Sequence, residues 1–192
     1  MSPADRQKTT YRLEMASRDE LRPPQQQPTD LDIRRVEIAC PEFNWFLHQL
    51  VGVEFRWGGR QHWGLQEWTQ YVDRPELETW VAYVEGTPAG YYELEKQDDG
   101  SVRIECFGLR RPFIGRGYGG TLLARAIDRC WEMGADHVWL STCSHDHPHA
   151  LKNYLARGFK LIRETTGAAN PPGQSALFGS GASPANKGDE PA

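Results

Sequence analysis

The chain has 192 residues and a formal net charge of −4, with charged residues making up 25% of it. This length suits one domain with a substantial core. The weakly acidic balance argues against a general nucleic-acid-binding protein, which usually carries a basic patch. No apolar stretch approaches the length of a membrane span.

The N-terminal part predicts a strand, a loop and two helices. Residues 9–16 (TTYRLEMA) alternate polar and apolar side chains, as a half-buried strand does. The Pro- and Gln-rich residues 20–30 indicate a loop. Residues 41–52 and 65–72 then repeat apolar side chains at helical spacing, so each predicts a helix.

Three strands are expected next, at residues 76–85, 90–97 and 101–109. The turn-forming sequences EGTP and QDDG separate them. Such short connections favour an antiparallel meander.

The C-terminal part alternates helices and strands. Residues 117–133 predict a helix that Gly134 ends, and residues 135–143 predict a buried strand. A short helix capped by Asp146 or His147 should run to Arg157, with Pro148 in its first turn. A last strand is expected at residues 159–165.

The resulting order, βαα–βββ–α–β–α–β, predicts a single α/β domain with a mixed sheet. We place this domain at residues 9–166, after a flexible segment at 1–8. Residues 167–192 are rich in small residues and proline, so we expect disorder there. Within this tail, residues 175–178 (SALF) could add an edge strand.

A glycine-rich stretch, PFIGRGYGGTLL at residues 112–123, precedes the central helix. Gly115, Gly117 and Gly120 satisfy G-x-G-x-x-G, the dinucleotide-binding fingerprint. In a Rossmann fold, however, that loop follows the first strand, and an acidic residue ends the next strand. Here several strands come earlier and the next strand ends in LSTC. Glycines at a helix N-terminus still suit an anionic group such as a pyrophosphate.

The same stretch resembles the cofactor motif of the GNAT superfamily of acetyl-CoA-dependent acyltransferases. Residues 114–119 (IGRGYG) are similar to its [Q/R]-x-x-G-x-G/A, with Ile114 in place of the usual Arg or Gln. Arg116 is a candidate for supplying the missing charge. The resemblance implies a GNAT-like fold and transfer of an acetyl group from acetyl-CoA to a primary amine by direct attack.

A second motif lies downstream. Ala150, Tyr154, Gly158 and Phe159 resemble the family's A-x-x-x-Y-x-x-x-G-F, with His147 where asparagine is common. The resemblance also implies that Phe107, Gly108 and Leu109, at the end of their strand, expose backbone groups that pair with the pantetheine arm. With these three, the cofactor-binding residues implied by the resemblance are Phe107, Gly108, Leu109, Ile114, Gly115, Arg116, Gly117, Tyr118, Gly119, Gly120 and His147.

The resemblance also implies a general acid and a general base. Tyr154 would donate a proton to the departing thiolate, and Glu105, on the strand VRIECFGL, would accept one from the amine. Strand alternation puts Arg103, Glu105 and Phe107 on one face and Ile104, Cys106 and Gly108 on the other. Glu93 and Glu95 on the preceding strand remain alternative bases.

The acceptor wall is expected in the stretch FRWGGRQHWG. Its residues Arg56, Trp57, Arg60 and Trp63 could bind an aromatic or anionic acceptor, a small molecule or a peptide. The alternative is that the tryptophans simply pack the helices onto the sheet.

The histidine cluster, the cysteines and the N-terminus argue against several kinds of site and location. The cluster HDHPH (residues 145–149) lacks a second ligand group, so we expect no metal. Four dispersed cysteines and an N-terminus without a signal-peptide core favour reduced thiols and a cytoplasmic location. We expect no nucleic-acid or membrane partner and leave a homodimer open. A non-catalytic acyl-CoA-binding module and an NAD-dependent oxidoreductase remain the alternative functions.

Overall fold

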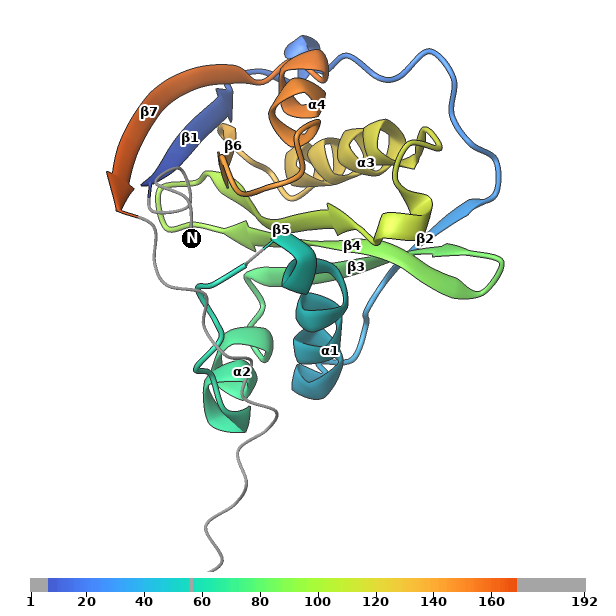
Figure 1. Cartoon of the computed structure of the whole chain (residues 1–192), viewed down its shortest axis with the longest axis vertical. Helices are drawn as coiled ribbons and strands as arrows, with labels where there is room; N and C mark the ends of the chain where they lie inside the picture. Colours follow the sequence, from blue (N-terminus) through green and yellow to red (C-terminus); the bar gives the residue numbers. More distant parts are fainter. Residues whose placement is uncertain (1–6, 56, 169–192) are drawn as a thin grey trace, which may run out of the picture.

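The computed structural model describes residues 7–55 and 57–168, which form a seven-stranded mixed sheet with helices on both faces (Figure 1). The expected α/β fold is therefore confirmed. The strands lie in the order β2-β3-β4-β5-β6-β1-β7. The strands are β1 (Gln7–Met15), β2 (Leu31–Arg35), β3 (Leu77–Val84), β4 (Thr87–Lys96), β5 (Val102–Leu109), β6 (Val138–Cys143) and β7 (Lys160–Ala168). The α-helices are α1 (Pro41–Gly52), α2 (Leu65–Val72), α3 (Tyr118–Glu132) and α4 (Ala150–Ala156), and short 3-10 turns occur at Arg18–Glu20, Val53–Phe55 and Arg111–Phe113.

The helices form two layers, with α3 and α4 on one face of the sheet and α1 and α2 on the other (Figure 1). Leu122, Leu123 and Ile127 of α3 are fully buried in the larger hydrophobic core. Leu47 and Val51 of α1 form a second core with strand residues on the opposite face. Apolar burial of this kind contributes about 25 cal/mol per Å². No helix within the described ranges has the length and apolarity needed to cross a membrane.

The N-terminal strand lies between β6 and β7 and is antiparallel to both. Gln7 and Lys8, which we expected outside the domain, belong to β1 and pair with Ala168 and Gly167 of β7. Gly167 and Ala168, which we expected in the disordered tail, belong to β7. Residues 1–6 of the predicted flexible segment, the rest of the tail from residue 169 and its SALF segment lie outside the described residues.

Two local predictions differ from the structure. The strand β2 was not predicted; it is a five-residue strand at the edge of the sheet that pairs only with β3. The helix α4 begins at Ala150, so neither Asp146 nor His147 caps it as expected. Asp146 instead accepts hydrogen bonds from the Thr142 hydroxyl (2.5 Å) and the Cys143 N–H (2.9 Å), and so closes the turn after β6.

The strand β5 carries a β-bulge that overturns the predicted alternation. Cys106 pairs with Glu93 and Ile104 with Leu94, so Glu105 is an extra residue on β5. As a result Cys106 packs in the α1 core, whereas Phe107 packs with Ile104 against the α3 core. Glu105 and Cys106 therefore share the α1 face, and Phe107 does not lie with Glu105.

Parallel pairing between β5 and β6 stops early. It joins Val102–Ile104 to Val138–Leu140, although β5 continues to Leu109 and β6 to Cys143. Beyond these pairs the two strands diverge, and on that side the last residues of β5 have no ladder partner among the described strands.

Candidate functional site

A cavity of about 770 Å³ opens where β5 and β6 diverge. This volume is in the range of small-molecule and cofactor sites. Residues from β1, β4, β5, β6 and all four α-helices line it, together with the segments between α1 and α2, before α3 and before α4. The sheet therefore contributes its unpaired strand ends directly to the cavity wall.

Most of the predicted cofactor residues meet at this cavity. The residues that line it are Phe107, Gly108, Leu109, Ile114, Gly115, Gly117, Gly119, Gly120 and His147. Arg116 and Tyr118 do not. The exposed Arg116 guanidinium lies 6.0 Å from the Phe113 ring, and the buried Tyr118 side chain donates a hydrogen bond to Asp30 at 2.6 Å. Neither the predicted charge of Arg116 nor the Tyr118 ring is thus part of the lining.

The glycine loop owes its shape to two left-handed residues. Gly115 has φ +83° and Gly117 φ +85°, a conformation that other residues adopt only with strain. Helix α3 begins immediately afterwards, with Gly117 as its N-cap. The free N–H groups and the positive dipole end of α3 accordingly lie beside the cavity, an arrangement suited to an anion.

Gly108 has a packing role besides its place in the lining. A Cβ on Gly108 would lie 2.5 Å from Cγ1 of Val51 and 3.3 Å from the Trp57 ring. The space beside Gly108 on this face of the sheet is thus filled by α1 and Trp57, which pack tightly on β5.

Tyr154 reaches the cavity from the α4 side of the sheet. Its side chain is 6% exposed, and its ring packs edge-on against Phe107 at 5.9 Å between centroids. Burial raises the pKa of the Tyr154 phenol above its ordinary value, with a further contribution from Asp146. The phenol therefore stays protonated at neutral pH and can act as a donor.

Glu105 reaches the same cavity from the α1 face, because of the bulge. Arg60 Nη2 donates to its Oε1 at 3.1 Å, and Arg103 Nε forms an ion pair with its Oε2 at 2.6 Å. Among the alternative bases, Glu95 also lines the cavity and is paired with Arg74. Glu93 is fully buried and does not line it.

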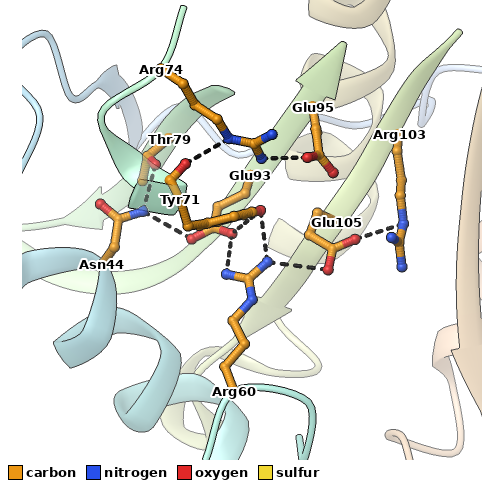
Figure 2. Close-up of polar contacts among 9 residues, drawn as sticks. All are labelled: Asn44, Arg60, Tyr71, Arg74, Thr79, Glu93, Glu95, Arg103 and Glu105. Carbon is orange, nitrogen blue, oxygen red and sulfur yellow. Dashed lines mark hydrogen bonds and ion pairs between the residues drawn. The ribbon is translucent and has the colours of Figure 1, made fainter. Parts of the chain in front are cut away.

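A buried polar network lies behind Glu105 (Figure 2). Glu93 accepts hydrogen bonds from Arg60 Nη1 (2.7 Å), the Asn44 amide (2.9 Å) and the Tyr71 hydroxyl (3.1 Å). Burial by itself would raise the pKa of Glu93, but the Arg60 charge and these hydrogen bonds hold that pKa below its ordinary value. Glu93 is consequently a buried anion that depends on its partners.

This network explains the position of Arg60, which was predicted to bind the acceptor. Its side chain is 6% exposed and its terminal nitrogens bind Glu93, Tyr71 and Glu105. Although Arg60 lines the cavity, its donors are engaged within the protein. It anchors the segment between α1 and α2 to the sheet.

Aromatic rings form the wall opposite the strand ends. Trp57, Trp63, Tyr71 and His48 all line the cavity. Trp63 packs on Tyr71 with centroids 5.2 Å apart. Arg56, the remaining predicted acceptor residue, lies outside the described residues. The wall gives an acceptor apolar surface as well as polar groups.

His48 is a buried histidine of this wall. It lies between Trp57 and Trp68, with ring centroids 5.6 and 5.7 Å away, and its Nδ1 has no hydrogen-bond partner. Burial and the nearby Arg60 charge lower the pKa of His48 from 6.5 to about 4. The imidazole is thus neutral at physiological pH.

Two histidines of the HDHPH stretch, His147 and His149, make contacts close to their own positions in the chain. His147 Nδ1 accepts a hydrogen bond from the His149 N–H at 3.2 Å, and the His147 ring packs edge-on against Phe55. In the part of the chain that the structure describes, no group of His, Cys, Asp and Glu side chains is arranged to hold a metal ion.

Sequence reasoning missed several residues of the lining, namely Lys8, Thr10, His48, Tyr71, Asp146 and Asn153. His48 lies on the predicted helix 41–52, so helical spacing could have placed it on the sheet-facing side. Lys8 was not accessible to such reasoning, because its position depends on β1 inserting between β6 and β7.

Comparison with known proteins agrees with this geometry. The family model described as "Acetyltransferase (GNAT) family" matches residues 41–159. A search of the curated proteins finds no matching protein. The chain spans between 50% and 64% of the length of five structurally similar solved proteins.

Three solved structures illustrate the similarity in fold. A GCN5-related N-acetyltransferase from Sphaerobacter thermophilus is 17% identical with a TM-score of 0.64, covering 86% of this chain and 53% of that one. One from Kribbella flavida is 16% identical with a TM-score of 0.60, covering 86% and 59%. A Bacillus subtilis acetyltransferase in complex with CoA is 23% identical with a TM-score of 0.52, covering 68% and 76%.

The buried ion pair leads to a stability prediction. Glu93→Ala leaves the Arg60 charge buried with only Glu105 to offset it, so we expect the free energy of unfolding to fall by about 3–5 kcal/mol. Asp32→Ala, which removes the exposed partner of Arg34, should change the free energy of unfolding far less, because solvent screens that pair. Urea denaturation measures both. Equal effects of the two substitutions would contradict the assigned role of Glu93.

His48 leads to a prediction about pH. The unfolded state protonates His48 near pH 6.5, whereas the folded state does so only near pH 4. The unfolded state binds more protons in that window, so stability should fall by on the order of 3 kcal/mol as the pH drops from 6.5 to 4. His48→Gln should flatten this part of the pH profile, because it removes the group that titrates differently in the two states. Parallel profiles for wild type and His48→Gln would refute the buried neutral state.

Proposed function

The chain belongs to the acetyltransferase (GNAT) family, and we propose that it transfers an acetyl group from acetyl-CoA to a primary amine. One observation carries the proposal. The opening between β5 and β6 brings the glycine loop, Glu105 and Tyr154 to a single cavity. The glycine loop suits binding of the acetyl donor, and Glu105 and Tyr154 suit the proton transfers of the reaction.

The donor would lie along the unpaired end of β5. Backbone groups of Phe107–Leu109 can pair with an amide-containing arm, because β6 no longer does so. Gly115 has open space where a side chain would lie, and Gly117, Gly119 and Gly120 line the same cavity, so a pyrophosphate could approach the backbone at the N-terminus of α3. With Ile114 at the first motif position and Arg116 outside the lining, these contacts are made mainly by the backbone. The CoA complex of the B. subtilis acetyltransferase supports this choice of donor.

The amine must lose a proton before or during its attack on the thioester carbonyl. A lysine-like amine has a pKa of about 10.4, so it is mostly protonated at neutral pH. Glu105 lines the cavity and is 18% exposed. Its Oε1 accepts one hydrogen bond, and its Oε2 is ion-paired with Arg103 but accepts none, so the carboxylate has lone pairs free to take a proton. We assign Glu105 as the base, acting directly or through water.

Tyr154 would act on the leaving group. Its phenol lines the cavity and is kept protonated by burial. It would donate a proton to the thiolate as the bond from carbon to sulfur breaks. Acid and base catalysis of this kind each contribute about a hundred- to ten-thousand-fold.

We also propose a cytoplasmic location. The described cysteines are all free, which supports a reducing compartment such as the cytoplasm. The acceptor is a small-molecule or peptide amine. No observation in the described residues favours the non-catalytic module or the oxidoreductase.

Donor binding is tested by thermal denaturation. Acetyl-CoA at about a hundred times its Kd should raise the Tm by about 5 °C or more. Gly117→Glu should abolish this shift, because it places a side chain and a negative charge at the N-cap of α3. Gly134→Glu is the matched control, since Gly134 has φ +78° at the far end of the same helix. It should keep the shift. An unchanged Tm for wild type at saturating acetyl-CoA would reject the donor.

The acid is tested by Tyr154→Phe. Removing the hydroxyl should lower kcat by about a hundredfold or more, with little change in the Kd for acetyl-CoA. Tyr83→Phe, outside the cavity, serves as the control. Thiol release measures turnover, and the thermal shift measures binding. Unchanged turnover in Tyr154→Phe would remove Tyr154 from the mechanism.

A further inference from the structure

Two arginines flank Glu105 but differ in how far the protein uses them (Figure 2). Arg60 is 6% exposed and binds three partners with its terminal nitrogens. Arg103 is 32% exposed and pairs with Glu105 through Nε. No hydrogen bond from its two terminal nitrogens reaches any residue in the ranges 7–55 and 57–168. Arg103 lines the cavity, so it offers unused donors there.

The Arg103 guanidinium is held in place by its surroundings. It stacks on Trp139 at 4.6 Å, and the two residues are neighbours across β5 and β6. Arg12 also contacts the Trp139 ring, at 3.9 Å, and is paired with Glu14 at 2.7 Å. The nearest acidic residue on β1 is therefore engaged elsewhere. A fixed, planar cation with a free edge suits a bidentate anion.

We propose that the acceptor is a primary amine that carries a carboxylate within a few bonds, as an amino acid does, and that Arg103 binds this carboxylate. This inference rests on the function proposed above. Arg103 Nε lies 2.6 Å from Oε2 of Glu105, the assigned base. An amine at Glu105 thus has Arg103 close by, and only a short link fits between its nitrogen and its carboxylate.

Charge balance supports the same acceptor. Arg60 and Arg103 together match Glu93 and Glu105, so the network has no excess charge of its own. An acceptor with one amine and one carboxylate enters without upsetting that balance. The aromatic wall of Trp57, Trp63 and Tyr71 leaves apolar surface for its side chain.

Other charged groups of the lining lie away from Glu105 or are paired. Glu95 is bound by Arg74. Lys8 lies two residues beyond Thr10, which pairs with Cys143, whereas Arg103 pairs with Trp139 near the start of β6. Lys8 and Asp146 are consequently at the far end of the cavity from Arg103. Arg103 is the cation best placed beside the reacting amine.

The test compares acceptors that differ only in the carboxylate. Thiol release from acetyl-CoA is measured with phenylalanine and 2-phenylethylamine, and with lysine and 1,5-diaminopentane. Wild type should show a kcat/KM at least about tenfold higher for each amino acid than for its decarboxylated partner. Arg103→Gln should lower kcat/KM for the amino acids by about 10- to 100-fold more than it lowers kcat/KM for the decarboxylated amines, because both series lose the ion pair with Glu105 but only the amino acids lose a carboxylate contact.

Two further variants sharpen the result. Arg103→Lys keeps the charge but loses the planar fork, so it should retain part of the preference. Arg12→Gln, on the same tryptophan but outside the lining, should change neither series. Equal use of both series by wild type overturns the proposal. An equal loss for both series in Arg103→Gln also overturns it, because Arg103 would then act only by positioning Glu105.

Failure of this inference can be told apart from failure of the proposed function. If no amine in the panel supports thiol release while acetyl-CoA still raises the Tm, the carboxylate-bearing acceptor is rejected and the donor assignment stands. If acetyl-CoA gives neither a thermal shift nor thiol release with any amine, both are rejected.

Discussion

The buried carboxylate of Glu93 constrains the whole acceptor side of the molecule. A charge with no exposed surface costs several kcal/mol unless opposite charge and hydrogen bonds compensate it. Asn44 of α1, Arg60 of the connecting segment and Tyr71 of α2 supply that compensation (Figure 2). The two helices and the segment between them are thereby fixed against β4. The aromatic wall of the cavity is thus positioned by electrostatics as well as by apolar packing.

The sheet brings the two proposed proton-transfer groups to one cavity from opposite faces. Tyr154 belongs to the α3 and α4 layer and packs on Phe107. Glu105 belongs to the α1 and α2 layer because the bulge turns it that way. The side chains can meet only where the sheet is interrupted, which is where β5 and β6 cease to pair. The bulge and the divergence of the strands are therefore parts of one arrangement.

Local sequence patterns predicted most of the helices and strands. They did not predict the features that depend on pairing with a distant strand. The helices α1 and α2 coincide with residues 41–52 and 65–72 because apolar spacing is a property of the segment itself. The bulge at Glu105 depends on the register with β4, which no pattern within β5 reveals. The strand β2 was not predicted, because its five residues follow a Pro-rich segment and form a strand only by pairing with β3.

The residues of the candidate site also fall into those predictable from a local motif and those that depend on distant contacts. The glycine loop and Tyr154 were predictable because each belongs to a compact motif, and the structure brings both to the cavity. The function of Arg60 was not, because its partner Glu93 is 33 positions away in the sequence. Sequence alone also could not distinguish Arg60 from Arg103. Their difference lies in burial, which converts the first into a structural cation and leaves the second available.

That difference in burial also sets when Arg103 can discriminate. In water the attraction between two unit charges at 4 Å is about 1 kcal/mol, and at the effective dielectric of a protein surface it is about 4 kcal/mol. The Arg103 guanidinium, with a side chain that is 32% exposed, therefore binds free anions weakly. An acceptor that packs on the aromatic wall removes water from Arg103 at the moment its carboxylate arrives. Apolar contact with the aromatic wall and charge recognition by Arg103 then strengthen each other. Selectivity for an acceptor that carries a carboxylate therefore depends on the wall and Arg103 together, not on Arg103 alone.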